Sequence, residues 1–191
     1  MQIKSSRKVQ MPSRETGDGV VGLEEDLLKI KSRLCEGSSQ LGIIPIVGMG
    51  GIGKTTLARY AYDDPLSVQH FDIRAWLTIS QSSNIKTILR TVLRSIKDVF
   101  NVHVPFWVHN DELLKGRRYL IVMDDLWDTN VWDELQRMFL NDLNGSRIII
   151  TTRELRVASY MNIEYHSHPH HMHLMNVEQS WMLLKEQSVW M

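Results

Sequence analysis

One glycine-rich stretch, residues 48–56, constrains the fold of this chain more than any other feature. It runs Gly-Met-Gly-Gly-Ile-Gly-Lys-Thr-Thr, so four residues separate Gly48 from Gly53-Lys54-Thr55. An apolar run precedes it at 43–47, and a segment with helical spacing follows it at 57–62. A strand, a glycine loop and a helix in this order form a phosphate-binding P-loop, so the stretch predicts a nucleotide site.

The residue types of this loop suit the chemistry of a triphosphate. Backbone N–H groups can surround phosphate oxygens only where no Cβ blocks their approach, and glycine meets that condition. The helix that starts near Lys54 adds the positive end of its dipole. We expect the Lys54 ammonium to reach the β- and γ-phosphates and the Thr55 hydroxyl to bind Mg²⁺. The predicted nucleotide-binding residues of the loop are Gly48, Gly50, Gly51, Ile52, Gly53, Lys54, Thr55 and Thr56.

Pro45 lies inside the apolar run that precedes the loop. Proline has no N–H group and cannot donate to a neighbouring strand. Two arrangements are open: the strand begins after Pro45, or the proline nitrogen faces an irregular neighbour.

Composition excludes several classes of function. Lys and Arg together number 22, as do Asp and Glu, so no net charge favours nucleic acid or a membrane surface. Cys35 is the only cysteine of the 191 residues, which rules out an internal disulfide and suits a reducing compartment. No transmembrane run or signal-peptide core is present. We therefore expect a cytoplasmic protein.

Strand-like and helix-like segments alternate along the chain. Strands are predicted within 43–47, 71–80, 119–123 and 147–151, and helices within 23–34, 57–62, 85–99, 131–138, 155–161 and 177–187. This alternation predicts an α/β P-loop NTPase fold, with a mainly parallel sheet flanked by helices in three α/β/α layers. Residues 1–17 are polar and basic, and we expect them to form a tail or linker remnant.

Two acidic residues, Asp124 and Asp125, follow the continuous apolar run 119–123. Such a run is typical of a strand buried on both faces of a parallel sheet, and a Mg²⁺–nucleotide needs an acid at the tip of a neighbouring strand. We expect Asp124 to hold Mg²⁺ through water and Asp125 to orient or deprotonate an attacking water. A plain surface turn is the alternative. Lys54 and Asp125 are the candidate catalytic residues.

Arg153 follows the short apolar strand 148–151. An arginine at the end of a sheet strand can detect a γ-phosphate through charge-assisted hydrogen bonds. Its spacing fits a plain surface cation equally well, so the sequence pattern alone leaves both roles open.

Five of the eight histidines lie between His166 and His173. No cysteine is near them, Pro169 interrupts the run, and no helical pair of ligands is present. The segment therefore predicts an exposed loop and not a metal site. His173 and Leu174 are candidates for the start of a short strand.

Six blocks occur in one order along the chain: Val20–Glu25, Gly48–Thr56, Phe71–Trp76 with Ser80-Gln81, Asp124–Trp127, Gly145–Arg153, and Leu174 with Ser180–Leu184. In this order they resemble the NB-ARC domain of plant coiled-coil nucleotide-binding leucine-rich-repeat disease resistance proteins, of the late blight resistance type. The resemblance covers about residues 18–190. It favours the phosphate-sensing role for Arg153.

The resemblance implies an ADP/ATP switch in plant defence. ADP keeps such a receptor off, and exchange for ATP permits self-oligomerisation and signalling with the other receptor domains. ATP hydrolysis is at most slow. Val20 and Val21, in the leading block, would lie near the adenine.

The family's later segments have no counterpart in residues 18–191. These are a Gly-Leu-Pro-Leu block, a winged-helix Met-His-Asp block and the leucine-rich repeats; Met172-His173-Leu174 lies too early to be the second of them. We therefore expect the nucleotide-binding subdomain alone. Two alternatives are an autonomous P-loop ATPase and a non-functional truncated paralogue.

Overall fold

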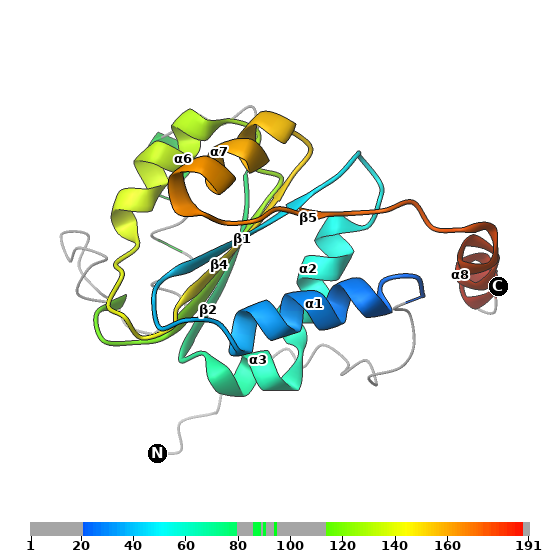
Figure 1. The fold of residues 1–191 in the computed structure, drawn as a ribbon, viewed down its shortest axis with the longest axis horizontal. Coiled ribbons are helices and arrows are strands. Elements are labelled where there is room, and N and C mark those ends of the chain that lie inside the picture. The colour runs from blue at the N-terminus through cyan, green and yellow to red at the C-terminus, as the bar shows by residue number, and fades with distance from the viewer. Residues whose placement is uncertain (1–20, 80–85, 89, 91–93, 95–113, 189–191) are drawn as a thin grey trace, which may run out of the picture. The chain divides into compact units, whose positions relative to one another are not determined.

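The computed structural model describes residues 21–79, 86–88, 90, 94 and 114–188 (Figure 1). They belong to two compact units. The larger unit, Leu23–Leu174, contains the sheet and the P-loop. The described residues of the smaller unit are 21–22 and 175–188.

A parallel sheet forms the centre of the larger unit. Its strands are β1 (Gly42–Val47), β2 (Ile73–Thr78), β3 (Tyr119–Asp124), β4 (Arg147–Thr152) and β5 (His170–His171), in the spatial order β2-β3-β4-β1-β5. All four pairings are parallel. Every residue of β3 and β4 is buried, as expected for inner strands covered on both faces. The predicted strands are confirmed.

Helices cover both faces of this sheet (Figure 1). One face carries α1 (Glu24–Cys35), α2 (Lys54–Asp63) and α3 (Pro65–His70), and the other carries α6 (Thr129–Leu135), a 3₁₀ turn (Gln136–Met138) and α7 (Leu155–Tyr165). The three-layer α/β/α prediction is thereby confirmed. In the smaller unit, α8 spans Val177–Ser188, and its Val177, Trp181 and Leu184 are exposed.

Alternate residues of the strands fill two separate cores. Ile121 and Ile148 are fully buried and pack with Trp132 of α6 on one face. Their strand neighbours Val122 and Ile149 point to the opposite face, where α2 buries Leu57. These apolar layers fix the register of the strands, because a shift by one residue would exchange the two faces.

Pro45 lies within β1 and not before it, so the second of the two arrangements is correct. The nitrogens of Gly42 and Gly48 donate toward β4, to Ser146 O just before that strand and to Thr152 O at its end. Backbone groups alternate sides along a strand, so Pro45 faces away from β4. On that side, β5 pairs only with Ile46 and Val47 of β1. The missing N–H therefore removes no bond to β4.

Two short helices begin at aspartate caps. The Asp128 carboxylate accepts from Asn130 N (3.2 Å) and caps the start of α6. The Asp64 carboxylate accepts from Leu66 N (3.0 Å) and starts α3. The sequence predicted the end of α2 at this point but not the six-residue helix that follows it.

The histidine-rich segment is only partly the exposed loop that its composition predicted. His170 and His171 form β5, earlier than the strand expected at 173–174, and Ser167 and Met172 are buried. His170 Nε2 lies 3.1 Å from Asp26 Oδ1 of α1. Pairing with β1 gives this part of the segment fixed partners that its polar composition did not indicate. Within the described ranges, no group of three or more His, Cys, Asp or Glu side chains could hold a metal ion.

Much of the helix predicted at 85–99 lies outside the described residues. Residues 86–88, 90 and 94 are described and are helical, and Ile88 is buried. In the described part of the chain, we find no helix with the length and apolar character needed to cross a membrane.

Candidate functional site

The P-loop connects the carboxyl end of β1 to the start of α2. Gly51 (φ 76°) and Gly53 (φ 101°) adopt the left-handed conformation that favours glycine. Gly48 is required for another reason, since a Cβ there would lie 3.0 Å from Met172 Cβ and 3.1 Å from Ile52 Cγ2. The loop therefore keeps a tight path with its backbone accessible.

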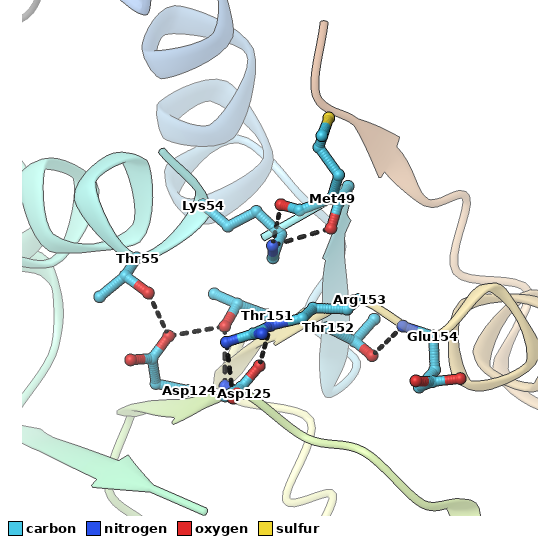
Figure 2. Close-up of polar contacts among 10 residues, drawn as sticks. Met49, Lys54, Thr55, Asp124, Asp125, Thr151, Thr152, Arg153 and Glu154 are labelled. Carbon is cyan, nitrogen blue, oxygen red and sulfur yellow. Dashed lines mark hydrogen bonds and ion pairs between the residues drawn. The ribbon is translucent and has the colours of Figure 1, made fainter. Parts of the chain in front are cut away.

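Lys54 is folded back onto the loop (Figure 2). Its ammonium donates to Gly48 O and Met49 O, each at 2.8 Å, although the residue is only 6% exposed. Burial lowers the pKa of Lys54, and the charge of Arg153 lowers it further, while Asp125 and Asp124 act in the opposite direction. An ammonium has three donors, so one stays available for a phosphate oxygen.

Asp124 and Thr55, the two predicted Mg²⁺ residues, are in direct contact. The buried Asp124 carboxylate accepts from Thr55 Oγ1 at 2.8 Å through Oδ1 (Figure 2). A carboxylate and a hydroxyl are the hard oxygen ligands that Mg²⁺ prefers. The donor set at this position therefore fits the ion.

Thr151 joins the acidic residues to the sheet. We expected the strand that carries Asp124 to lie next to the P-loop strand β1. In the structure β4 lies between β3 and β1. From β4, Thr151 Oγ1 donates to Asp124 Oδ1 (2.6 Å) and accepts from Asp125 N (2.9 Å). Sequence reasoning missed this role. The available signal was a hydroxyl directly after the three isoleucines at 148–150.

Asp125 and Arg153 bind one another. Arg153 Nε donates to Asp125 Oδ1 (3.1 Å), and Arg153 Nη2 donates to Asp125 Oδ2 (3.3 Å), so the two side chains form a bidentate ion pair (Figure 2). The pair is partly exposed and contributes about 0–1 kcal/mol to stability. Asp125 has φ 62°, which is rare for a residue with a Cβ. A Cβ at Gly50 would lie 3.5 Å from Arg153 Nη1, so Arg153 also adjoins the P-loop.

Two apolar side chains pack on the loop and were not predicted. Leu23 lies 3.7 Å, and Met172 3.9 Å, from the position of a Cβ at Gly53. Both residues are buried. Nothing in their type distinguishes them from ordinary core residues, so the sequence carried no signal for this contact.

The structure brings most of the predicted residues together. The loop residues, Lys54, Thr55, Asp124, Asp125 and Arg153 all lie at the carboxyl edge of the parallel sheet, where α/β proteins bind ligands. Thr56 is exposed on the first turn of α2. Val20 lies outside the described residues, and Val21 belongs to the smaller unit.

Solved structures share this fold. Cdc6p from Pyrobaculum aerophilum matches with a TM-score of 0.67 at 14% identity, over 96% of this chain and 52% of that one. The Aeropyrum pernix ORC2 protein matches with a TM-score of 0.59 at 17% identity, over 96% of this chain and 54% of that one. At such low identity the likeness shows the fold alone.

Curated relatives are closer in sequence and much longer. The late blight resistance protein homolog R1B-14 of Solanum demissum is 37% identical over 175 residues, which are 87% of this chain and 13% of that protein. Late blight resistance protein R1-A of the same species is 35% identical over 189 residues, 95% of this chain and 14% of that protein. The pattern of the NB-ARC domain matches residues 23–191. With this match and the P-loop geometry together, the chain belongs to the NB-ARC family.

Proposed function

We propose that residues 18–191 form the nucleotide-binding subdomain of a plant disease-resistance receptor and act as an ADP/ATP switch. The observation that carries this proposal is the convergence of Lys54, Thr55, Asp124 and Arg153 around one glycine loop. Residues 1–17 would be a tail or linker remnant.

The side chains around the loop suggest how a nucleotide binds. The phosphates would lie against the N–H groups of residues 48–55, with Lys54 donating its third N–H to an oxygen. Thr55 and Asp124 would hold Mg²⁺, which neutralises phosphate charge when bound. Leu23 and Met172 supply apolar surface beside the loop.

The pairing of Asp125 with Arg153 supports a switch more than a rapid ATPase. Asp125 is placed beside the loop, yet both of its carboxylate oxygens are occupied by Arg153. An attacking water at Asp125 would have to share these oxygens with the Arg153 guanidinium, since each carboxylate oxygen can accept more than one hydrogen bond. A γ-phosphate would compete for the same guanidinium, whereas ADP carries no such group. ATP would therefore rearrange this pair and ADP would leave it intact.

The similar proteins agree with this proposal. The Aeropyrum pernix ORC2 protein was solved in an ADP form and in ADPNP–ADP complexes, on the same fold. The relatives from Solanum demissum are named for late blight resistance. Defence signalling, contacts with other receptor domains, self-oligomers and a cytoplasmic location follow from these relatives as parts of the proposal.

Calorimetric titration of the purified, folded chain with ADP and with ATP, each with Mg²⁺, tests the proposal. We expect saturable binding of both nucleotides and little steady-state turnover. Lys54→Ala should weaken binding by at least about tenfold, because a charged hydrogen bond contributes about 1.5–3 kcal/mol. The matched control is Lys115→Ala, an exposed lysine at the opposite edge of the sheet.

Three outcomes would decide between the alternatives. A folded chain that binds neither nucleotide contradicts the switch and fits a non-functional paralogue. Sustained turnover that is lost in Asp125→Asn identifies an autonomous ATPase. Equal loss of binding in Lys54→Ala and Lys115→Ala would mean that the P-loop does not hold the nucleotide.

A further inference from the structure

A cavity lies at the amino edge of the sheet, opposite the P-loop. It is formed by the segments that lead into β1, β2, β3 and β4 and is lined mainly by Cys35, Ser38, His70, Arg118, Asn144 and Arg147. The strands have six residues each, which at about 3.3 Å per residue separates the two edges by about 20 Å. A ligand here would not touch the nucleotide site.

The cavity contains two guanidinium groups without acidic partners. Among the described residues, no carboxylate lies within ion-pair distance of Arg118 or Arg147. Asp72 is the nearby acid, but its carboxylate accepts from Arg118 N of the backbone (2.9 Å). Two positive charges that share one cavity therefore have only neutral groups as partners.

Arg147 is held in place by backbone carbonyls. Its guanidinium donates to Arg33 O (3.1 Å), Gln40 O (2.9 Å), Ser146 O (2.9 Å) and Ser38 O (2.8 Å). These bonds use four of its five N–H donors. Arg147 therefore has a structural role, and its contribution to the cavity is mainly its fixed charge.

Arg118 has donors to spare. Its Nε donates to Asn144 O (2.7 Å), and Nη1 lies 3.3 Å from His70 Nε2. Within the described residues, Nη2 has no hydrogen-bond partner. Burial lowers the pKa of His70, and the charges of Arg118 and Arg147 lower it further. The field across the cavity is therefore positive and favours an anion.

Glycines make room for this arrangement. A Cβ at Gly37 would lie 2.3 Å from Arg147 Nη2, and Gly145 has φ 81° with its Cβ position 3.6 Å from Arg118 Nε. The cavity volume is about 270 Å³, just below the range of about 300–1,000 Å³ for drug-sized ligands. A small ion or a compact metabolite fits this volume better than a nucleotide.

We propose that this cavity, which we name the amino-edge pocket, binds a compact oxyanion: inorganic phosphate or the phosphate group of a small phosphomonoester. Arg118 would supply two N–H donors to the oxygens, and Arg147 a second fixed positive charge. His70 would donate a hydrogen bond from one ring nitrogen. This site is independent of the proposed nucleotide switch.

Titration of the chain with inorganic phosphate tests the proposal. ADP is present to saturate the P-loop, and the titration is repeated with the Lys54→Ala variant, so that phosphate binding at the P-loop is separated from binding at the amino-edge pocket. We expect a saturable rise in melting temperature relative to chloride at equal ionic strength. Arg118→Gln should weaken phosphate binding at least about tenfold, because it removes charged donors. Arg117→Gln is the matched control, since it removes the same charge from the adjacent exposed residue, which does not line the pocket. Equal responses of the two variants would overturn the proposal.

Cys35 gives a second readout in the unmutated chain. It lines the amino-edge pocket and is the only cysteine of the chain, so a thiol reagent reports on this position alone. An anion beside it would disfavour the thiolate, so phosphate should slow modification of Cys35, saturating at the same concentration as the thermal shift. An unchanged rate in the folded wild type would overturn the proposal even if Arg118→Gln failed to fold. The same titrations with glycerol phosphate show whether the pocket prefers inorganic phosphate or a small phosphomonoester.

Discussion

Thr151 illustrates how one buried hydroxyl can set the geometry of two acidic residues. It is 1% exposed and bonds both the Asp124 carboxylate and the backbone N–H of Asp125. The site therefore depends on a residue that touches neither phosphate nor metal in the proposed mechanism. Its role is to position Asp124.

Thr151→Val should lower the Mg²⁺-dependent part of ATP affinity by about tenfold, because Asp124 loses a fixed partner and Asp125 N is left unbonded. We expect a stability loss of about 1–3 kcal/mol for the same reason. Calorimetry with and without Mg²⁺ measures the first effect and urea unfolding the second.

Thr152→Val is the matched control, because its hydroxyl accepts from Glu154 N (3.0 Å) and not from the acidic pair. Thr151→Ser should restore the Mg²⁺ dependence. If Thr151→Val and Thr152→Val changed it equally, positioning by Thr151 would be refuted.

The Asp125–Arg153 pair predicts a change in nucleotide preference. Asp125→Asn keeps a residue type that tolerates φ 62° but removes the charge that holds Arg153. Arg153 should then meet a γ-phosphate without competition, so the ATP to ADP affinity ratio should rise several-fold. Competition calorimetry measures this ratio.

The double variant Asp125→Asn with Arg153→Gln provides the control for this effect. It should lose the preference gained by Asp125→Asn alone. A rise that persists without Arg153 would show that the exchange of partners is not its cause.

The elements differ in how readily the sequence predicts them. Strands β3 and β4 are predictable because each contains an unbroken apolar run, residues 119–123 and 148–150, that is buried on both faces of the sheet. The six residues of α3 and the two of β5 are too short to show a period, and tertiary contacts fix them. At the site, Lys54 and Asp124 were found by motif, whereas Thr151, Leu23 and Met172 belong to residue types that occur in any core.

The cap of α6 should be measurable because the helix is short. Asp128→Ala removes the carboxylate that accepts from Asn130 N and should cost about 0.5–2 kcal/mol. The seven residues of α6 include the buried Trp132, so fraying would disturb the core. Asp128→Asn retains a capping oxygen and should unfold in urea close to the wild type. A loss shared by both variants would assign the effect to charge and not to the cap.

Stability of the whole larger unit should depend on pH through two half-buried histidines, His70 and His170, which lie on different parts of it. Burial lowers the pKa of His170 more than Asp26 raises it, with Arg33 and Lys29 lowering it further. The pKa of His70 is lowered by burial and by Arg118 and Arg147. The fold therefore favours the neutral form of both histidines relative to the unfolded chain. The unfolded chain binds their protons more readily, at a pKa near about 6.5.

The sign of the effect follows from this difference. Below about pH 6.5 the unfolded state gains protons that the folded state resists, so stability falls as pH falls. Each histidine contributes at most about 1.4 kcal/mol per pH unit. We expect the free energy of urea unfolding to drop between pH 7.5 and 5.5, and His70→Gln and His170→Gln each to flatten that drop. Phosphate bound in the amino-edge pocket should reduce the part of the pH dependence that comes from His70 and leave the part from His170 unchanged. The reason is that a bound anion favours the protonated His70 ring and so opposes the charges of Arg118 and Arg147.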